Sequence, residues 1–438
     1  MSVQLADLET VEVIADPIVR SAAPRVLLAA YQCGPGMGSV SQIGWEWYSR
    51  LSRRIAVTLI THIRNREALH AAGAPFNDSE IIYIDTEWFA GPLYRFAKKI
   101  FPTSEHSVFL VSSLDFFVYD RDALKLLKKR MKMGERWDIV HAVTPVSTVA
   151  PTRLHSLGSP VVLGPLNAGL GTPRAFADVL KGDSPWLYPV RNFGRVIDWI
   201  VGSTRNAATI LTATKATIES VPARHHQRCR AMLENGVELN RFHASPWPDP
   251  PSKTNPLRVL FVGRLVPFKA VGLLLEAGSR ARREFPIEVT IVGEGPMLEE
   301  WKSISKSLAL DDCVSFLGSQ SLDEVAKHMR AAHVFCLPSV RESGGAVLLE
   351  AMASARPVIA VAFGGPAEIV DDGVGVAIPP DGREPVIAGI ASAFKDICQN
   401  PELWRARGEE GRRRAEELYG WDAKIESAIQ LYQRMINR

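Results

Sequence analysis

The stretch from Ser339 to Ile369 constrains the fold of this chain more than any other segment. The apolar run Ala332–Pro338 comes before it and predicts a buried strand of a parallel sheet. The pair Gly344–Gly345 follows, and from Val347 to Ala355 apolar residues recur at helical spacing. Where a strand leads through such a turn into a helix, free backbone N–H groups and the positive end of the helix dipole favour an anion. The stretch therefore predicts a parallel α/β fold that contains an anion site.

Two carboxylates flank this anion site. Glu342 stands just before the predicted helix and Glu350 about two turns inside it, which separates them by a rise on the order of 12 Å. That separation is too long for the paired carboxylates of a retaining glycosidase. A carboxylate beside an anion site must be balanced by its ligand. We therefore expect a ligand with phosphate in the middle and hydroxyls at both ends, which is a nucleotide sugar.

Strand-like and helix-like segments alternate along the chain, which predicts an α/β fold with doubly wound parallel sheets. Residues 1–245 hold one such series and residues 257–420 a second, with the Pro-rich linker 246–256 between them. Candidate strands are 25–31, 55–61, 81–84, 139–143, 161–163, 209–212, 258–262, 289–292 and 314–317. We therefore expect two Rossmann-like lobes that face each other across a cleft, with the ligand at the carboxyl ends of the strands.

Composition argues against several classes of protein. The net charge of +3 gives no argument for a nucleic-acid partner. The five cysteines are scattered and lack metal-ligand spacing, which favours a reduced, cytosolic protein. Residues 1–24 carry four acidic side chains, which is wrong for a signal peptide and fits a frayed arm. No uncharged apolar run reaches the length of a membrane span.

A glycine turn follows the first candidate strand. Gly34, Gly36 and Gly38 are spaced by single residues, a poor match to the G-x-G-x-x-G of a dinucleotide-binding oxidoreductase. Glycine after a strand still lets the backbone approach a phosphate. Two cations, Arg264 and Lys269, follow the first strand of the second half. Both can neutralise a diphosphate there, although a solvated basic pair is the alternative.

Seven motifs occur along the chain in a characteristic order. They are Gly34–Gly38, Asn235–Val237, Phe261–Leu265 followed by Lys269, Val292–Pro296, Phe316–Gly318, Glu342–Glu350 and Gly364–Glu368. On these residues, which extend over nearly the whole chain, the sequence resembles the retaining GT-B glycosyltransferases of the large family 4 (glycosyltransferases group 1), in its bacterial polysaccharide-type subset. The resemblance implies a GT-B fold in which residues 421–438 cross back to brace the N-terminal lobe.

The resemblance also implies an activity, the transfer of a hexose from a UDP- or GDP-sugar to a glycan or lipid-linked acceptor with retention. No Asp-x-Asp stands at the end of a candidate strand, so we expect cations rather than a metal to stabilise the leaving group, and no cofactor. In the usual proposal for such enzymes the departing phosphate takes the acceptor's proton, and no dedicated nucleophile is required. A nucleotide-sugar epimerase on the same fold and a catalytically silent nucleotide-sugar-binding scaffold are the alternatives.

The resemblance assigns roles to individual residues. Arg264 and Lys269 would neutralise the diphosphate, Glu342 would accept hydrogen bonds from the transferred sugar, and Glu350 would accept them from the ribose. The alternative for Glu350 is a surface carboxylate, and for Glu368 it is a favourable charge in a first helical turn. The residues expected to bind the donor are Gly36, Met37, Gly38, Gly263, Gly293, Gly295, Ser343, Gly344 and Gly345, together with Glu350.

Two positions depart from the family pattern. Relatives usually carry His-x-His at the end of the strand that holds His141, but Val143 stands at the second position here. A bacterial subset has His-x-x-Thr, which makes His141 a candidate catalytic residue and Thr144 a candidate on the acceptor side. A buried, hydrogen-bonded His141 is the alternative. The second departure is Ser343–Gly345, where many relatives have Phe-Gly, and it leaves the donated sugar open.

The acceptor side is expected in the first half of the chain. Gly164 and Asn167 belong to a glycine-containing loop after a strand, where they would line the acceptor, although such loops are also plain turns. Basic amphipathic segments, residues 89–102 and 123–136, predict contact with an anionic membrane surface and a lipid-linked acceptor. Ordinary solvated helix faces are the alternative. We therefore expect a cytoplasmic protein that is peripheral at the inner face of the membrane.

Overall fold

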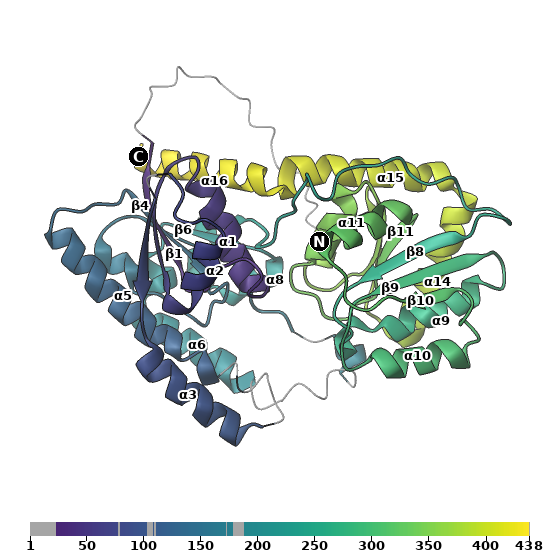
Figure 1. Ribbon diagram of the computed structural model, residues 1–438, viewed down its shortest axis with the longest axis horizontal. Coiled ribbons are helices and arrows are strands. Elements are labelled where there is room, and N and C mark those ends of the chain that lie inside the picture. Colours follow the sequence, from purple (N-terminus) through teal and green to yellow (C-terminus); the bar gives the residue numbers. More distant parts are fainter. Residues whose placement is uncertain are drawn as a thin grey trace, which may run out of the picture.

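The structure, a computed structural model, contains two lobes that lie side by side, each built on one parallel sheet (Figure 1). It describes residues 23–437 apart from 78, 103–107, 109–110, 172 and 178–187, and the side chains of 188–194 also lie outside the description. The acidic arm expected at residues 1–24 falls almost wholly outside the described residues.

The N-terminal lobe is built on a seven-stranded parallel sheet with the order β3-β2-β1-β4-β5-β6-β7. Its strands are β1 (Arg25–Ala30), β2 (Ala56–His62), β3 (Glu80–Ile84), β4 (Ile139–Thr144), β5 (Val161–Leu166), β6 (Thr209–Thr212) and β7 (Cys229–Ala231). The first six correspond to the strands expected from the sequence. The apolar pattern did not reveal β7, because two of the three residues of this edge strand are exposed.

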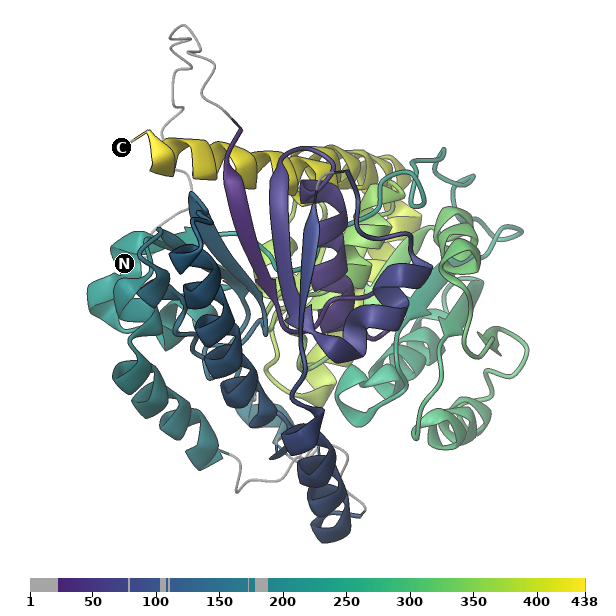
Figure 2. The same ribbon diagram turned by 60° about the vertical axis from the view of Figure 1, so that its left-hand side comes forward.

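Helices cover both faces of this sheet (Figure 2). Along β1, Val26 and Leu28 pack towards α1 (Ser39–Leu51) and α16 (Trp421–Ile436), whereas Leu27 and Ala29 pack towards α5 (Asp115–Lys132). Two further helices, α3 (Glu87–Ile100) and α6 (Tyr188–Val201), lie on the α5 side. The short helices are α2 (Arg66–Ala71), α7 (Ser203–Asn206) and α8 (Lys215–Ser220). Both faces of the central strands are therefore buried, which explains their continuous apolar sequences.

The C-terminal lobe is built on a six-stranded parallel sheet with the order β10-β9-β8-β11-β12-β13. Its strands are β8 (Leu257–Val262), β9 (Ile287–Val292), β10 (Val314–Phe316), β11 (Val334–Leu337), β12 (Val358–Val361) and β13 (Gly375–Ile378). Its helices are α9 (Val271–Ala281), α10 (Leu298–Ser307), α11 (Leu322–Ala331), α12 (Ala346–Ala353), α13 (Pro366–Ile369), α14 (Arg383–Gln399) and α15 (Pro401–Arg414). Phe261, Phe335 and Trp404 are among the largest side chains buried in its core.

The last helix of the chain crosses from one lobe to the other. A π-helical turn, Ala415–Tyr419, joins α15 of the C-terminal lobe to α16. On α16, Trp421, Ile425 and Tyr432 are buried in the core of the N-terminal lobe. Figure 1 shows α15 and α16 in yellow, running along the same side of both lobes. Folding of the N-terminal lobe thus depends on the final residues of the chain.

Two other segments tie the lobes together. The linker is held by the buried Arg356, whose guanidinium donates to the backbone oxygens of Ser245 (3.2 Å) and Pro246 (3.0 Å). After β5 the chain runs out to the second lobe, where Phe176 is only 3% exposed and belongs to the C-terminal core. We name the described residues of this segment, 167–171 and 173–177, the strap. The strap brings N-terminal residues to the place where the lobes meet.

Candidate functional site

Loops at the carboxyl ends of strands from both sheets meet where the lobes join. A carboxylate oxygen of Glu368, in the segment after β12, accepts a 3.1 Å hydrogen bond from the backbone N–H of Lys215, which follows β6. Leu170 of the strap lies against Gly364, in the same loop as Glu368. The predicted site residues of the C-terminal lobe stand on the loops after β8, β9 and β11 and at the start of α12.

Lys269 and Glu342 form an ion pair between the loops after β8 and β11. The ammonium of Lys269 donates a hydrogen bond to Glu342 Oε2, and the two side chains are only 13% and 15% exposed. Lys269 ends the 3-10 turn Pro267–Lys269, and Glu342 is held by a backbone bridge to Gly364. The sequence predicts both residues for the site but not their contact. Because the pair has no net charge, the full charge of Lys269 reaches a diphosphate only when the pair opens.

Arg264 is the cation on the same loop that carries no counter-charge. Its side chain is exposed, and no carboxylate pairs with it among the residues that the structure describes. The backbone on either side is fixed, since the N–H of Gly263 donates to the Val292 oxygen (3.0 Å) and that of Leu265 to the Glu294 oxygen (2.8 Å). Arg264 therefore projects from a held loop with its charge available to an anion.

Gly293 and Gly295 allow the loops after β8 and β9 to lie against each other. Their φ angles are 136° and 156°, in a region that favours glycine. A Cβ at Gly293 would lie 2.0 Å from the Gly263 oxygen, and one at Gly295 would lie 2.4 Å from the Leu265 oxygen. Packing of the loop that carries Arg264 thus accounts for both glycines, and their contact with the donor stays a prediction.

The turn before α12 packs against residues of the N-terminal lobe. Gly345 precedes the helix in the left-handed conformation with φ 59°, and the first N–H groups of the helix have no intrahelical partner. Ser343 is exposed, whereas Gly344 is buried against Glu234. A Cβ at Gly344 would lie 2.0 Å from Glu234 Oε1 and 2.2 Å from Asn235 Nδ2. The close approach of these two side chains requires glycine at this position.

Glu350 lies nearer the start of its helix than expected. Residues 342–345 form a loop and α12 begins at Ala346, so Glu350 is about one turn inside the helix, and its predicted position two turns inside is wrong. Its side chain is half-buried, and no donor reaches its carboxylate within the described residues. Burial raises the pKa of Glu350 to about 7, while the charge of Arg241 acts in the opposite direction. A poorly solvated carboxylate without a donor has acceptor capacity to offer to ligand hydroxyls.

The glycine turn after β1 leads into an uncapped helix. Gly36 and Gly38 have φ angles of 72° and 105°, and Gly38 is the N-cap of α1, where no side chain accepts a capping hydrogen bond. Met37 between them is 43% exposed. The N-terminal lobe thus presents a second helix start with free N–H groups at the carboxyl edge of its sheet.

His141 is a core residue. It is fully buried, its Nδ1 lies 2.6 Å from Tyr432 Oη, and its Nε2 lies 2.6 Å from the backbone oxygen of Gly164. Trp47 packs against the ring at a centroid distance of 4.8 Å. Burial lowers the pKa of His141 to about 4, so the imidazole is neutral at physiological pH. The predicted catalytic role is wrong, because both ring nitrogens are occupied by neighbours inside the lobe, and the buried alternative describes this residue.

Two of the three residues predicted for the acceptor side support loops instead. Thr144 is 4% exposed, and its hydroxyl donates to the Gln32 oxygen (2.9 Å) and accepts from the Gln32 N–H (3.0 Å). Gly164 is buried with φ 95°, and a Cβ there would lie 2.5 Å from the Leu211 oxygen. Burial contradicts direct acceptor contact for both. Asn167 does reach the lobe junction, where its side-chain amide donates to Glu234.

Two buried charged residues at this junction were missed from the sequence. Glu234, 4% exposed, accepts from Asn167 and Asn235 through Oε1, and no partner reaches Oε2 within the described ranges. Lys424 of α16, 3% exposed, donates to the backbone oxygens of Leu233 and Asn235. Burial raises the pKa of Glu234 and lowers that of Lys424 to about 7. Glu234 directly precedes the motif that begins at Asn235, a signal that could have found it, whereas Lys424 stands 189 residues beyond Asn235 and has no such signal.

The described part of the chain contains no cluster of three or more His, Cys, Asp and Glu residues that could hold a metal. Within the same residues, no helix is long and apolar enough to span a bilayer. Leaving-group stabilisation by cations without a metal stays a prediction.

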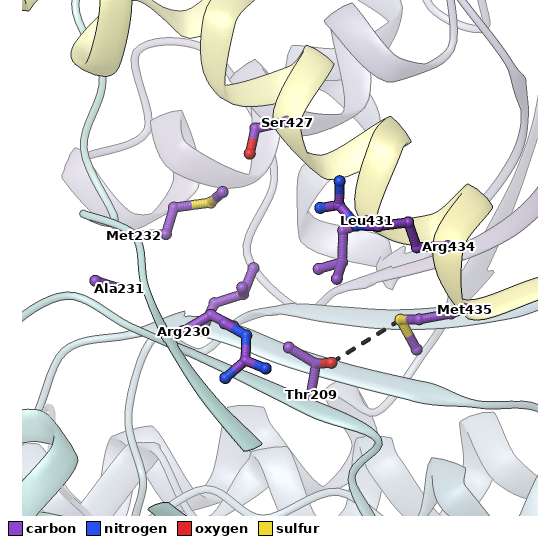
Figure 3. A pocket seen from close by; sticks show the side chains of 9 residues that line it. Thr209, Arg230, Ala231, Met232, Ser427, Leu431, Arg434 and Met435 are labelled. Carbon is purple, nitrogen blue, oxygen red and sulfur yellow. Dashed lines mark hydrogen bonds between the residues drawn. The ribbon is translucent and has the colours of Figure 1, made fainter. Parts of the chain in front are cut away.

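A separate hollow of about 290 Å³ lies between β6, β7 and α16 (Figure 3). Arg230 and Arg434 line it from opposite sides, and the Thr209 hydroxyl lies 4.0 Å from the Met435 sulfur. None of the predicted site residues lines this hollow.

Known proteins resemble the chain in parts of its sequence. Residues 248–414 match the family model described as Glycosyl transferases group 1. A D-inositol 3-phosphate glycosyltransferase of Geodermatophilus obscurus is 35% identical over 218 residues, which are 45% of this chain and 45% of that protein. One of Streptomyces avermitilis is 30% identical over 246 residues, 52% of each chain. The matched part of the chain thus spans about half the length of these curated relatives.

Solved structures share the fold of nearly the whole chain. Anabaena Alr3699/HepE in complex with UDP has a TM-score of 0.62 and 16% identity, covering 94% of this chain and 99% of that one. The apo form of the lipopolysaccharide outer core galactosyltransferase WaaB has a TM-score of 0.61 and 16% identity, covering 93% and 99%. At such identities the likeness shows the fold alone. With the two parallel sheets, it confirms the predicted α/β fold of the GT-B type.

Proposed function

We propose that the protein is a glycosyltransferase that moves a hexose from a UDP- or GDP-sugar to a glycan or lipid-linked acceptor. The observation that carries the proposal is the grouping of Arg264, the Lys269–Glu342 pair and the free start of α12 on adjacent loops. A guanidinium, an ammonium and a helix start suit a diphosphate. The carboxylates of Glu342 and Glu350 suit the hydroxyls on either side of it. The match of residues 248–414 to the glycosyltransferase family supports the same assignment.

In the proposed reaction, the bond between the anomeric carbon of the sugar and the diphosphate oxygen breaks, and a bond to the acceptor oxygen forms on the same face. The proton of the acceptor hydroxyl passes to the departing phosphate, so the configuration is retained without an enzyme nucleophile. Negative charge grows on the leaving oxygen, and Arg264 stabilises it more strongly in the transition state than in the ground state. We propose that these cations act without a metal.

The ion pair would take part in an exchange of partners. Lys269 is bonded to Glu342 in this structure, so an entering diphosphate competes with the carboxylate for the ammonium. As the phosphate draws Lys269 away, the oxygens of Glu342 become free to accept hydrogen bonds from the hexose. Glu350 would hold the ribose with the acceptor capacity that no protein donor fills.

The comparisons support the substrate classes to be tested. The Anabaena neighbour contains UDP, and the curated relatives are named for inositol 3-phosphate. A phosphorylated polyol therefore joins glycans and lipid-linked sugars among the acceptors to be tried. A lipid-linked acceptor would require peripheral contact with a membrane, which we include in the proposal.

Nucleotide release tests the function directly. Purified protein is incubated with a panel of UDP- and GDP-sugars, with and without each class of acceptor. Arg264→Ala should lower acceptor-dependent release by about 100-fold or more, as the loss of a transition-state charge donor does elsewhere. Arg283→Ala, which removes an exposed arginine elsewhere in the same lobe, should leave the rate unchanged.

Three outcomes would count against the proposal. Wild-type rates for Arg264→Ala in a folded protein would remove this residue from the site. Conversion of the donor to an epimer without nucleotide release would identify an epimerase. Nucleotide-sugar binding without release or conversion, for every acceptor, would identify a binding scaffold.

A further inference from the structure

Two helices of the N-terminal lobe, α3 and α6, carry seven of the fifteen large apolar side chains that are exposed in the described structure. On α3, Trp88 is 65% and Phe96 59% exposed, and on α6, Trp199 and Ile200 are each 68% exposed. Burying such side chains in the core would have been favourable, and burial of one is worth about 1.5–3 kcal/mol. Exposed apolar groups that gather in this way mark a surface that meets something else.

Helix α3 contacts its own lobe through a narrow strip. Ala90 and Ala97, two turns apart, are its only buried residues among those described. The opposite side carries Trp88 and Arg95, which are both exposed. Phe96 and Ile100, one turn apart, are exposed on one flank of the helix. Helix α3 thus buries two alanines and exposes most of its aromatic side chains. This pattern is typical of a helix that lies at an interface rather than in a core.

Helix α6 shows the same pattern on the same side of the sheet. Trp199 and Ile200 are exposed together with Val196, next to the exposed Arg195. Figures 1 and 2 both show α3, α5 and α6 on the side of the N-terminal sheet opposite α1 and α16. The basic segments predicted from the sequence, residues 89–102 and 123–136, cover most of α3 and α5, whereas neither of them covers α6.

The charges on these three helices are strongly unbalanced. Exposed cations without an ion-pair partner in the described structure are Arg95, Lys98, Lys99, Lys125, Lys128, Lys129, Lys132 and Arg195. Arg130 differs, because it is paired with Glu80 and Glu135. The acidic residues of the same helices are neutralised or buried: Glu87 pairs with Arg64, Asp122 pairs with Arg121, and Asp115, Asp120 and Asp198 are buried.

We propose that the face formed by α3, α5 and α6 docks on a lipid bilayer that contains anionic lipid. Tryptophan and long apolar side chains partition into the boundary between headgroups and acyl chains, and the surrounding lysines and arginines attract anionic headgroups. A second copy of the chain is a poorer occupant, since it would bring eight unpaired cations against eight more. The inference deepens the proposed function by naming the surface that would meet a lipid-linked acceptor, and its test is independent of transfer.

Apolar variants test the insertion of side chains. The full chain is floated with vesicles of phosphatidylcholine alone and of phosphatidylcholine mixed with phosphatidylglycerol. Wild type should bind the anionic vesicles, and the double variant Trp199→Ala/Ile200→Ala should bind at least about tenfold more weakly. The control Leu322→Ala/Leu403→Ala removes two half-exposed leucines of the C-terminal lobe and should bind as wild type does.

Charge variants test the electrostatic part. Lys98→Glu/Lys99→Glu should weaken binding to the anionic vesicles by at least about 30-fold, from the loss of two surface cations alone, and high salt should reproduce the loss. Lys253→Glu/Lys306→Glu makes the same charge change at exposed lysines of the linker and C-terminal lobe and should have no effect.

The proposal would be overturned if wild type failed to bind anionic vesicles, or if test and control variants bound equally. It would also be overturned if the wild type were a dimer in solution and Trp199→Ala/Ile200→Ala a monomer, because this face would then join two copies. None of these measurements uses a nucleotide sugar. Failure here therefore leaves the transferase proposal standing, and failure of nucleotide release leaves the docking surface standing.

Discussion

Nucleotide binding should depend on pH through Glu350. Its carboxyl is half-buried, no donor in the described structure reaches it, and burial raises its pKa to about 7. In the proposed complex only the ionised form accepts hydrogen bonds from both ribose hydroxyls. One pH unit below the pKa roughly one molecule in eleven is ionised, and one unit above it roughly ten in eleven are. The affinity for UDP should therefore fall about tenfold between about pH 8 and about pH 6.

Calorimetric titration with UDP across this range measures the effect. Glu350→Gln keeps the shape of the side chain but does not titrate, so it should bind more weakly at the higher pH and lose the tenfold slope. The terminal phosphate of UDP also titrates near about pH 6, but it does so equally for both proteins, and the difference between the two curves isolates the carboxyl. Parallel curves for wild type and variant would refute the ribose role.

The raised pKa of Glu350 also predicts in which direction the free energy of unfolding changes with pH. A carboxyl with a higher pKa in the folded than in the unfolded state binds more protons when folded, so the free energy of unfolding falls as the pH rises from about 4.5 to about 7. The full shift corresponds to about 3 kcal/mol, and partial exposure of Glu350 makes the expected loss smaller. Chemical denaturation at both ends of the range should show this loss in wild type. The free energy of unfolding of Glu350→Gln should change less over the same range.

Three further substitutions test other parts of the lobe junction. Gly344→Ala should lower both UDP affinity and the melting temperature, because the new methyl would lie 2.0 Å from Glu234 Oε1; an unchanged thermal shift with UDP would contradict this. His141→Ala should cost about 2–4 kcal/mol of stability by leaving a cavity and an unpaired Tyr432 hydroxyl, while the donor KM of the folded enzyme stays the same; a changed KM would restore a direct role for the histidine. Phe176→Ala should cost about 3–5 kcal/mol and expose the strap to proteases, and limited proteolysis with denaturation curves would check both.

The fold and the placement of Arg264, Lys269 and Glu342 on neighbouring loops were predictable because their signals are local. A short apolar run, a glycine turn and a helical pattern lie within a few tens of residues of one another, as from Ala332 to Ala355. Arg264 and Lys269 stand five residues apart on the same loop, so a strand end places both. The parallel sheet then brings this loop beside Glu342 without further information from the sequence.

What could not be predicted depends on contacts between distant residues. His141 looks the same in sequence whether it faces a ligand or a core, and its burial is decided by Tyr432, which is 291 residues away. Phe176 gives no sign in its own segment that it packs in the other lobe. Glu234 follows β7, the edge strand that the apolar pattern does not reveal, and the loop that brings it close to Gly344 is bonded to the distant Lys424 of α16.

Arg264 and Lys269 look equivalent in the sequence but differ in the structure in whether a carboxylate is paired with them. Arg264 has no counter-charge among the described residues, so in the proposed function it would attract a diphosphate from the moment of encounter, whereas the charge of Lys269 is cancelled by Glu342 until the pair opens. In the proposed reaction, opening the pair would supply a second cation to the phosphate and free Glu342 for the hexose in the same step. Because each of these gains would require the other, the proposed function predicts that sugar recognition follows diphosphate binding and is coupled to it. A free hexose, which cannot open the pair by its charge, would find the carboxylate occupied.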